Sequence, residues 1–147
     1  MLANGEALHV VTESLAAFAS PTCAIAGIEA RGFIFGSTIA TYLHRGFIPI
    51  RKSGKLPFTT HSRNYALEYG ESTLEIHIDA IALGQDVLLV DDVLATGGTM
   101  CAAIELIGAC GGVVRDIATI LEIPGLGGRA RISALHPGIA IHTLISS

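Results

Sequence analysis

The chain has 147 residues, a length that suggests a single domain; half of the residues are hydrophobic and 15% are charged. This composition favours a compact α/β core over disorder, and the net charge of −4 argues against a general nucleic-acid-binding surface. No apolar run is long enough to span a membrane, and the N-terminus lacks the pattern of a secretory signal, so we expect a cytoplasmic protein with no nucleic-acid or membrane partner. Neither the three cysteines nor the six histidines have zinc-binding spacing, and we expect the cysteines to be reduced thiols in the core.

The hydrophobic pattern along the chain predicts strands that alternate with helices. Helices are expected at residues 6–18, 35–44, 100–110 and 126–135, and strands at 23–28, 47–50, 66–69, 73–78, 87–90, 113–122 and 139–145. The alternation predicts an α/β fold, with a mostly parallel sheet flanked by helices and a hairpin made by the third and fourth strands. The polar and basic stretch 51–63 is expected to be a flexible loop. Ligands of such a sheet bind beyond the carboxyl ends of its parallel strands.

The first polar cluster in chain order follows the strand predicted at residues 23–28. Glu29, Ala30 and Arg31 stand at the carboxyl end of that strand. An isolated arginine is usually a surface residue, but a strand end places Arg31 at the ligand-binding edge of the sheet. Arg31 is therefore a candidate for contacting a phosphate group.

A basic cluster follows the strand predicted at residues 47–50. Arg51, Lys52 and Lys55 are three of the nine lysines and arginines of an acidic chain, and they lie within five residues. A solvated basic loop would explain them, and so would a site for a multiply charged anion such as pyrophosphate. The composition of this cluster alone leaves both interpretations open.

Two glutamates lie in the predicted hairpin. Glu68 is part of a Leu-Glu-Tyr-Gly sequence, and Glu75 is part of a Leu-Glu-Ile step. A glutamate in a hairpin is most often a surface charge. We interpret Glu75 as structural and return to Glu68 below.

The most informative stretch joins the strand predicted at 87–90 to the helix predicted at 100–110. Two carboxylates, Asp91 and Asp92, follow the apolar run, and a turn of small residues leads into the helix; the turn consists of Ala95, Thr96, Gly97, Gly98 and Thr99. Glycines allow positive φ and close backbone approach, and the first amides of a helix have no intrahelical partner. The turn is therefore typical of a phosphate site, with the two acids beside it as acceptors for sugar hydroxyls or a magnesium shell.

Two other nucleotide motifs are absent from the sequence. A strand that ends in two aspartates is also typical of P-loop ATPases, but the chain has no G-x-x-x-x-G-K-[ST] loop. The nearest approach to a G-x-G-x-x-G dinucleotide fingerprint, at residues 125–130, has Ala130 in its sixth position. We interpret that stretch as a loop or the start of a helix.

The residues quoted above resemble one family in particular. Residues 90–99 resemble the phosphoribosyl pyrophosphate (PRPP) signature of type I phosphoribosyltransferases. Residues 27–33, 51–57 and 67–70 are similar to the corresponding segments of the adenine phosphoribosyltransferases, and the match runs in order as far as Gly128. Orotate and hypoxanthine relatives share the PRPP loop but generally lack the second and third of these segments. The resemblance implies the type I phosphoribosyltransferase fold with a flexible catalytic hairpin.

The resemblance also implies a role for each candidate residue. The 5-phosphate and ribose of PRPP would be bound by Asp91, Asp92, Ala95, Thr96, Gly97, Gly98 and Thr99. Pyrophosphate would be bound by Glu29, Ala30, Arg31, Arg51, Lys52 and Lys55. Leu94 would contact the base, Glu68 would act on the purine as a general acid or base, and Mg²⁺ would bind mainly through PRPP near the two aspartates. The family further implies a cis peptide bond between Glu29 and Ala30, and a homodimer in which Arg51 serves the neighbouring site.

The implied reaction converts adenine and PRPP to AMP and pyrophosphate. A non-catalytic PRPP-sensing regulator and a transferase for another purine, such as xanthine, are alternatives. The family has an N-terminal hood over the base, and residues 1–147 resemble the single domain that follows this hood. We therefore expect the chain to bind the phosphates of PRPP or AMP with weakened adenine binding.

Overall fold

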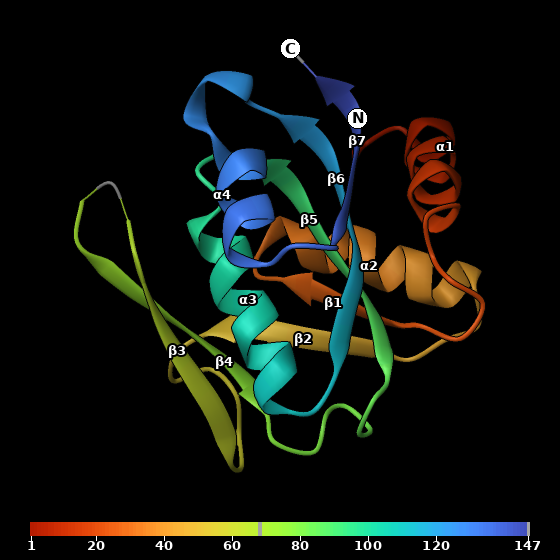
Figure 1. The fold of residues 1–147 in the computed structure, drawn as a ribbon. Helices are drawn as coiled ribbons and strands as arrows, with labels where there is room; N and C mark the ends of the chain where they lie inside the picture. Colours follow the sequence, from red (N-terminus) through yellow and green to blue (C-terminus); the bar gives the residue numbers. More distant parts are fainter. Residues whose placement is uncertain (68, 147) are drawn as a thin grey trace.

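The computed structural model describes residues 1–67 and 69–146 (Figure 1). Its helices are α1 (Gly5–Ala16), α2 (Arg31–Tyr42), α3 (Gly98–Ala109) and α4 (Gly128–Leu135), with a short 3₁₀ helix, η1 (Pro124–Leu126). Its strands are β1 (Ala24–Ile28), β2 (Phe47–Lys52), β3 (Thr60–Ala66), β4 (Glu71–His77), β5 (Asp86–Leu94), β6 (Val113–Glu122) and β7 (Ala140–Ser146). The predicted alternation of strands and helices is confirmed.

The strands form one seven-stranded sheet in the order β3-β4-β2-β1-β5-β6-β7. Strands β2, β1, β5, β6 and β7 run parallel to one another, whereas β4 is antiparallel to both β2 and β3. The mostly parallel sheet and the hairpin are therefore as predicted. The central strands β1 and β5 are apolar over much of their length because helices cover both of their faces.

Helices cover both faces of the sheet (Figure 1), and a hydrophobic core lies on each face. Helices α1 and α2 contribute Leu15, Phe35 and Ile39 to one core, which packs on β1, β5 and β6. On the other face, α3 contributes a nearly continuous apolar surface and α4 contributes Ile132. This two-sided packing fixes the central strands, and it fixes the strand ends from which the polar residues project.

Three elements, β5, β3 and α2, have a boundary more than two residues from the predicted one. Strand β5 continues through the two aspartates to Leu94, because its pairing with β6 continues as far as Glu122. Strand β3 spans Thr60–Ala66 and therefore ends where the strand was predicted to begin; its first residues lie in the stretch that was predicted to be a loop, because that segment pairs with β4. Helix α2 begins at Arg31, four residues earlier than predicted, directly after the end of β1.

The predicted state of the cysteines is confirmed among the described residues. Cys23 and Cys101 are buried, Cys110 is half-buried, and all three are free thiols. No helix in residues 1–67 or 69–146 combines the length and the apolar character needed to cross a bilayer.

Candidate active site

Three neighbouring strands, β2, β1 and β5, deliver polar residues to one edge of the sheet. Helix α2 leaves the end of β1 on one face and α3 leaves the end of β5 on the other, so a crevice opens between them. Such a switch point is where open α/β sheets bind ligands. The structure has a cavity of about 280 Å³ here, lined by Glu29, Ala30, Arg31, Lys52, Tyr65, Asp91, Asp92 and Thr99.

A second, smaller cavity lies directly beside the first and marks the phosphate loop, residues 95–99. It has a volume of about 80 Å³ and is lined by Asp91, Val93, Leu94, Ala95, Thr96, Gly97, Thr99 and Met100. Gly97 precedes α3 with a φ of 78°, and its carbonyl accepts the first helical hydrogen bond, from the amide of Cys101. The amides at the start of α3 consequently have no intrahelical acceptor, and a phosphate of this size would satisfy them.

The phosphate loop is supported from behind by the turn that leads into α4. A Cβ atom added at Gly97 would lie 2.8 Å from the carbonyl oxygen of Gly128, and one added at Gly128 would overlap the carbonyl oxygen of Ala95. Only glycines allow the two turns to approach so closely. Gly128 was not predicted to belong to the site, because a glycine in the sequence does not show what packs against it.

The acidic pair Asp91 and Asp92 lies between the two cavities. The backbone N–H of Asp92 donates to Asp91 Oδ1 at 2.8 Å, and Arg31 Nε donates to Asp92 Oδ2. Burial raises the pKa of Asp91 to about 8; the N–H of Asp92 opposes this shift, and the negative charge of Asp92 reinforces it. The free protein therefore carries a proton on Asp91 at neutral pH, and a cationic or hydroxyl-bearing ligand would favour its release.

The basic segment, residues 51–55, is held against Glu29 at the end of β1. Glu29 follows β1, and the peptide bond between Glu29 and Ala30 is cis, as the resemblance implies. Its carboxylate accepts hydrogen bonds from the backbone N–H of Lys52 at 2.9 Å, from Lys55 Nζ at 2.7 Å and from Arg51 Nη2 at 3.4 Å. Burial alone would raise the pKa of Glu29, but these hydrogen bonds, with that of Lys55 the largest, lower it to about 2. Glu29 is thus ionised and serves as an anionic partner for the cations of this segment.

The structure brings most of the predicted site residues to one edge, with two exceptions. Leu94 lines the smaller cavity, but the residue is 1% exposed and packs under Gly128, so its contact with a base stays a prediction. Glu68 lies outside the described residues. Tyr65, which was not predicted, lines the larger cavity from β3; its position depends on the pairing of β3, which the sequence pattern placed in a loop.

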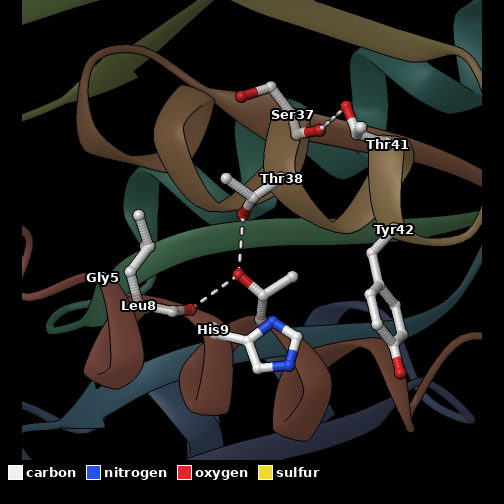
Figure 2. A pocket seen from close by; sticks show the side chains of 8 residues that line it. Gly5, Leu8, His9, Ser37, Thr38, Thr41 and Tyr42 are labelled. Atoms are coloured by element: carbon white, nitrogen blue, oxygen red, sulfur yellow. Dashed lines mark hydrogen bonds between the residues drawn. The ribbon is translucent and has the colours of Figure 1, made fainter.

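A larger groove lies elsewhere, between α1 and α2 (Figure 2). Its volume is about 420 Å³, and the hydroxyl of Thr12 at its floor donates to the carbonyl of Leu8 and bonds to Thr38. None of its eight lining residues is a lysine or an arginine, and the helix that begins at Gly5 is already capped, because the side chain of Asn4 accepts a hydrogen bond from the amide of Ala7. This groove therefore lacks the features that bind phosphate.

Comparison with known proteins first identifies the class of protein to which the chain belongs. The family model for the phosphoribosyl transferase domain matches residues 2–132. The adenine phosphoribosyltransferase of Symbiobacterium thermophilum is 50% identical over 134 residues, which are 90% of this chain and 79% of that protein. The chain spans 63% to 67% of the length of seven further adenine phosphoribosyltransferases, at 52% to 57% identity.

Solved structures agree with these matches. The crystal structure of adenine phosphoribosyltransferase from Thermoanaerobacter pseudethanolicus superposes with a TM-score of 0.92 at 43% identity, covering 99% of this chain and 84% of that one. The enzyme from Trypanosoma brucei, solved in complex with AMP, pyrophosphate and ribose-5-phosphate, has a TM-score of 0.88 at 29% identity and coverage of 99% and 66%. The fold is that of the type I phosphoribosyltransferases. Within that class, the chain belongs to the adenine phosphoribosyltransferase family.

Proposed function

We propose that the protein transfers the 5-phosphoribosyl group of PRPP to adenine, giving AMP and pyrophosphate. The observation that carries this proposal is the phosphate-sized cavity at the start of α3, which adjoins a larger cavity lined by two aspartates and by cations. The relatives point to adenine as the acceptor, and they do not favour a PRPP-sensing regulator or a transferase for another purine.

The phosphate loop would anchor the 5-phosphate of the substrate. The unpaired amides at the start of α3 and the hydroxyls of Thr96 and Thr99 are donors, and the small cavity fits one phosphate group. Anchoring one end of PRPP fixes the sugar, so that its anomeric carbon faces the incoming base.

The two aspartates would act on the ribose. Asp91 and Asp92 line the cavity in which the sugar would lie, and their carboxylates accept hydrogen bonds from its hydroxyls. Displacement at the anomeric carbon passes through a positively charged, oxocarbenium-like state, which ionised carboxylates stabilise. Burial raises the pKa of Asp91 in the absence of ligand, so the positive charge of Mg²⁺ and of the reacting sugar would be what favours its ionised form.

Mg²⁺ is part of the proposal as a companion of PRPP. Residues 1–67 and 69–146 contain no group of three or more His, Cys, Asp or Glu residues able to hold a metal. The pair Asp91 and Asp92 nonetheless fits a magnesium ion that keeps most of its ligands from water and phosphate. Mg²⁺ would neutralise the charge of the leaving pyrophosphate.

The basic segment and Arg31 would hold pyrophosphate as it leaves. In the free protein these cations are already paired, Arg31 with Asp92 and Lys55 with Glu29, so binding exchanges one anionic partner for another. Glu68 is proposed to handle the purine proton. A cytoplasmic homodimer in which Arg51 also serves the neighbouring site completes the proposal.

The test is conversion of radiolabelled adenine to AMP by the purified chain, with PRPP and Mg²⁺ supplied. We expect AMP formation that depends on both, and we expect PRPP binding by calorimetry that Asp92→Asn weakens. Absence of binding to both AMP and Mg²⁺–PRPP would contradict the proposal. Hypoxanthine and xanthine in place of adenine test the identity of the base.

A further inference from the structure

Glu75, on β4, is a largely buried carboxylate: the residue as a whole is 9% exposed. A buried carboxylate is costly unless hydrogen bonds satisfy it. Oε1 of Glu75 accepts a hydrogen bond from the hydroxyl of Ser53 at 2.8 Å, and Oε2 accepts one from the backbone N–H of Gly54 at 3.1 Å. Both donors belong to the basic segment rather than to the strand that carries the glutamate.

These bonds hold the chain at the point where β2 ends. The antiparallel ladder between β2 and β4 pairs Arg51 with Glu75 and ends with Lys52 opposite Leu74. One more backbone bond, from Ser53 N–H to a carbonyl of β4, extends this contact by a residue. Beyond the end of the ladder, the side chain of Glu75 therefore keeps residues 53 and 54 attached to β4, as far as the turn at Gly54, where φ is 80°.

The turn fixed by Glu75 leads directly to Lys55. Lys55 Nζ lies 2.7 Å from Glu29, and the carbonyl of Lys55 accepts a hydrogen bond from Arg51 Nη1 at 3.1 Å. Glu29 thus contacts the segment from the β1 side while Glu75 contacts it from β4. Because two carboxylates hold the segment in the folded protein, little ordering is left to occur when an anion binds.

We infer that Glu75 is a positioning residue for the pyrophosphate half of the site, an inference that rests on the proposed function. It acts through Ser53 and Gly54 on the placement of Arg51 and Lys55 and touches no ligand. The hydrogen bonds that make up this arrangement join Glu75 and β4 to Ser53 and Gly54, and none of them goes to the phosphate loop. Loss of Glu75 is therefore expected to weaken pyrophosphate binding selectively. Loss of a residue that only stabilises the fold would weaken both pyrophosphate binding and AMP binding.

The experiment compares Glu75→Gln with Glu71→Gln, which removes the same charge from an exposed position on the same strand. Calorimetry measures Kd for Mg²⁺–pyrophosphate and, separately, for AMP, and steady-state kinetics give KM for PRPP and kcat. In Glu75→Gln we expect Kd for pyrophosphate and KM for PRPP to rise about five- to tenfold, as for one lost charge-assisted hydrogen bond. Kd for AMP is expected to stay within twofold, and Glu71→Gln to leave the three binding parameters within twofold.

Ser53→Ala gives an independent route that removes only the hydroxyl donor. We expect a smaller rise of about two- to threefold in the Kd for pyrophosphate, and a double variant whose effect is less than the product of the two single effects. If Glu75→Gln does not fold, the Kd of Ser53→Ala for pyrophosphate tests the inference without it.

Equal weakening of AMP and pyrophosphate binding would overturn the inference, and so would unchanged pyrophosphate binding in the folded variants. If the unsubstituted chain binds neither ligand, the proposed function fails instead.

Discussion

The phosphate loop and the basic segment hold opposite ends of PRPP in our proposal, but they are built in different ways. The phosphate loop consists of main-chain groups at the start of α3, and the packing of Gly97 against Gly128 fixes its shape. The basic segment consists of long side chains at the end of β2; Lys55 is 48% exposed and is held by hydrogen bonds to carboxylates. The phosphate loop therefore depends on the shape of its backbone, and the basic segment depends on the charge of its side chains.

This difference indicates what each half can tolerate. A main-chain site is lost when the backbone cannot adopt its path, whatever the charge of the replacement. A side-chain site weakens gradually, because several cations share the anion and water screens each of them. Substitutions are therefore expected to have large effects at the glycines and progressively smaller effects toward the exposed side chains.

The largest effect is expected for Gly97→Ala. The new Cβ would lie 2.8 Å from the carbonyl oxygen of Gly128, at a φ of 78° that alanine rarely adopts. We expect AMP binding to weaken by about 2 to 3 kcal/mol, roughly 30- to 150-fold. Calorimetry measures Kd, and Gly108→Ala, in the same helix with open space around it, is the control that should leave Kd unchanged. A folded Gly97→Ala variant with near-normal AMP affinity would contradict the shape argument.

Asp91→Asn tests the acidic pair through pH. Because the folded pKa of Asp91 is about 8, the free protein holds this proton at pH 7 and loses it above pH 8. Binding of Mg²⁺–PRPP favours the ionised form, so affinity should rise by up to about tenfold in all between pH 7 and 9, most steeply below pH 8 and levelling off above it. The asparagine variant should bind more weakly with no such rise.

The proton release itself is measured by calorimetry in buffers of different ionisation enthalpy. Asp86→Asn, at the other end of β5, is the control and should keep the pH dependence of the unsubstituted chain. A rise with pH that persists in Asp91→Asn would assign the proton to another group.

Lys55→Ala tests the basic segment. We expect pyrophosphate binding to weaken about three- to tenfold, and AMP binding to remain unchanged, because the lost cation is one of several and is partly exposed.

The same substitution also tests how the stability of the fold depends on acid pH. The pKa of Glu29 is lowered from 4.5 to about 2, so its hydrogen bonds stabilise the fold above pH 4.5, and that contribution is lost as the pH falls to 2.

Thermal unfolding across this pH range tests the link between Lys55 and Glu29. The Tm of Lys55→Ala should be lower than that of the unsubstituted chain at pH 6, and the two values should converge near pH 2. A Tm difference that does not change with pH would show that Glu29 does not depend on Lys55.

The smallest effect is expected for Arg63→Ala. Arg63, on β3, forms an ion pair with Glu105 on α3; the side chain of Arg63 is 57% exposed and that of Glu105 is 36% exposed. Such pairs contribute about 0.5 kcal/mol or less, so Tm should fall by only a few degrees and AMP binding should not change. A loss of AMP affinity in this variant would mean that the hairpin shapes the phosphate loop, which the comparison of the two halves does not predict.

The phosphate loop could be predicted from sequence because its parts are local. Asp91 and Asp92 are separated by only a few residues from the glycines and threonines of the turn, and a strand followed by a helix supplies the geometry. The basic residues at 51–55 were found in the same way, as a cluster. The parallel sheet then brings the strand ends together, which the alternation of strands and helices predicted.

Features that depend on tertiary contacts could not be predicted. Gly128 reaches the phosphate loop from a position 31 residues after Gly97, and no local pattern shows that approach. The raised pKa of Asp91 comes from burial beside α2. The sequence could not show the partners of Glu75, because its two donors, Ser53 and Gly54, lie in the segment that follows β2. These are consequences of packing rather than of spacing.

The most direct measurement is an amide NMR titration of the ¹⁵N-labelled chain with AMP. The account predicts that the largest shifts fall on the backbone amides of residues 96–100, where the unpaired N–H groups of α3 would receive the phosphate. Shifts confined to the groove between α1 and α2, or no shifts at saturating AMP, would contradict it.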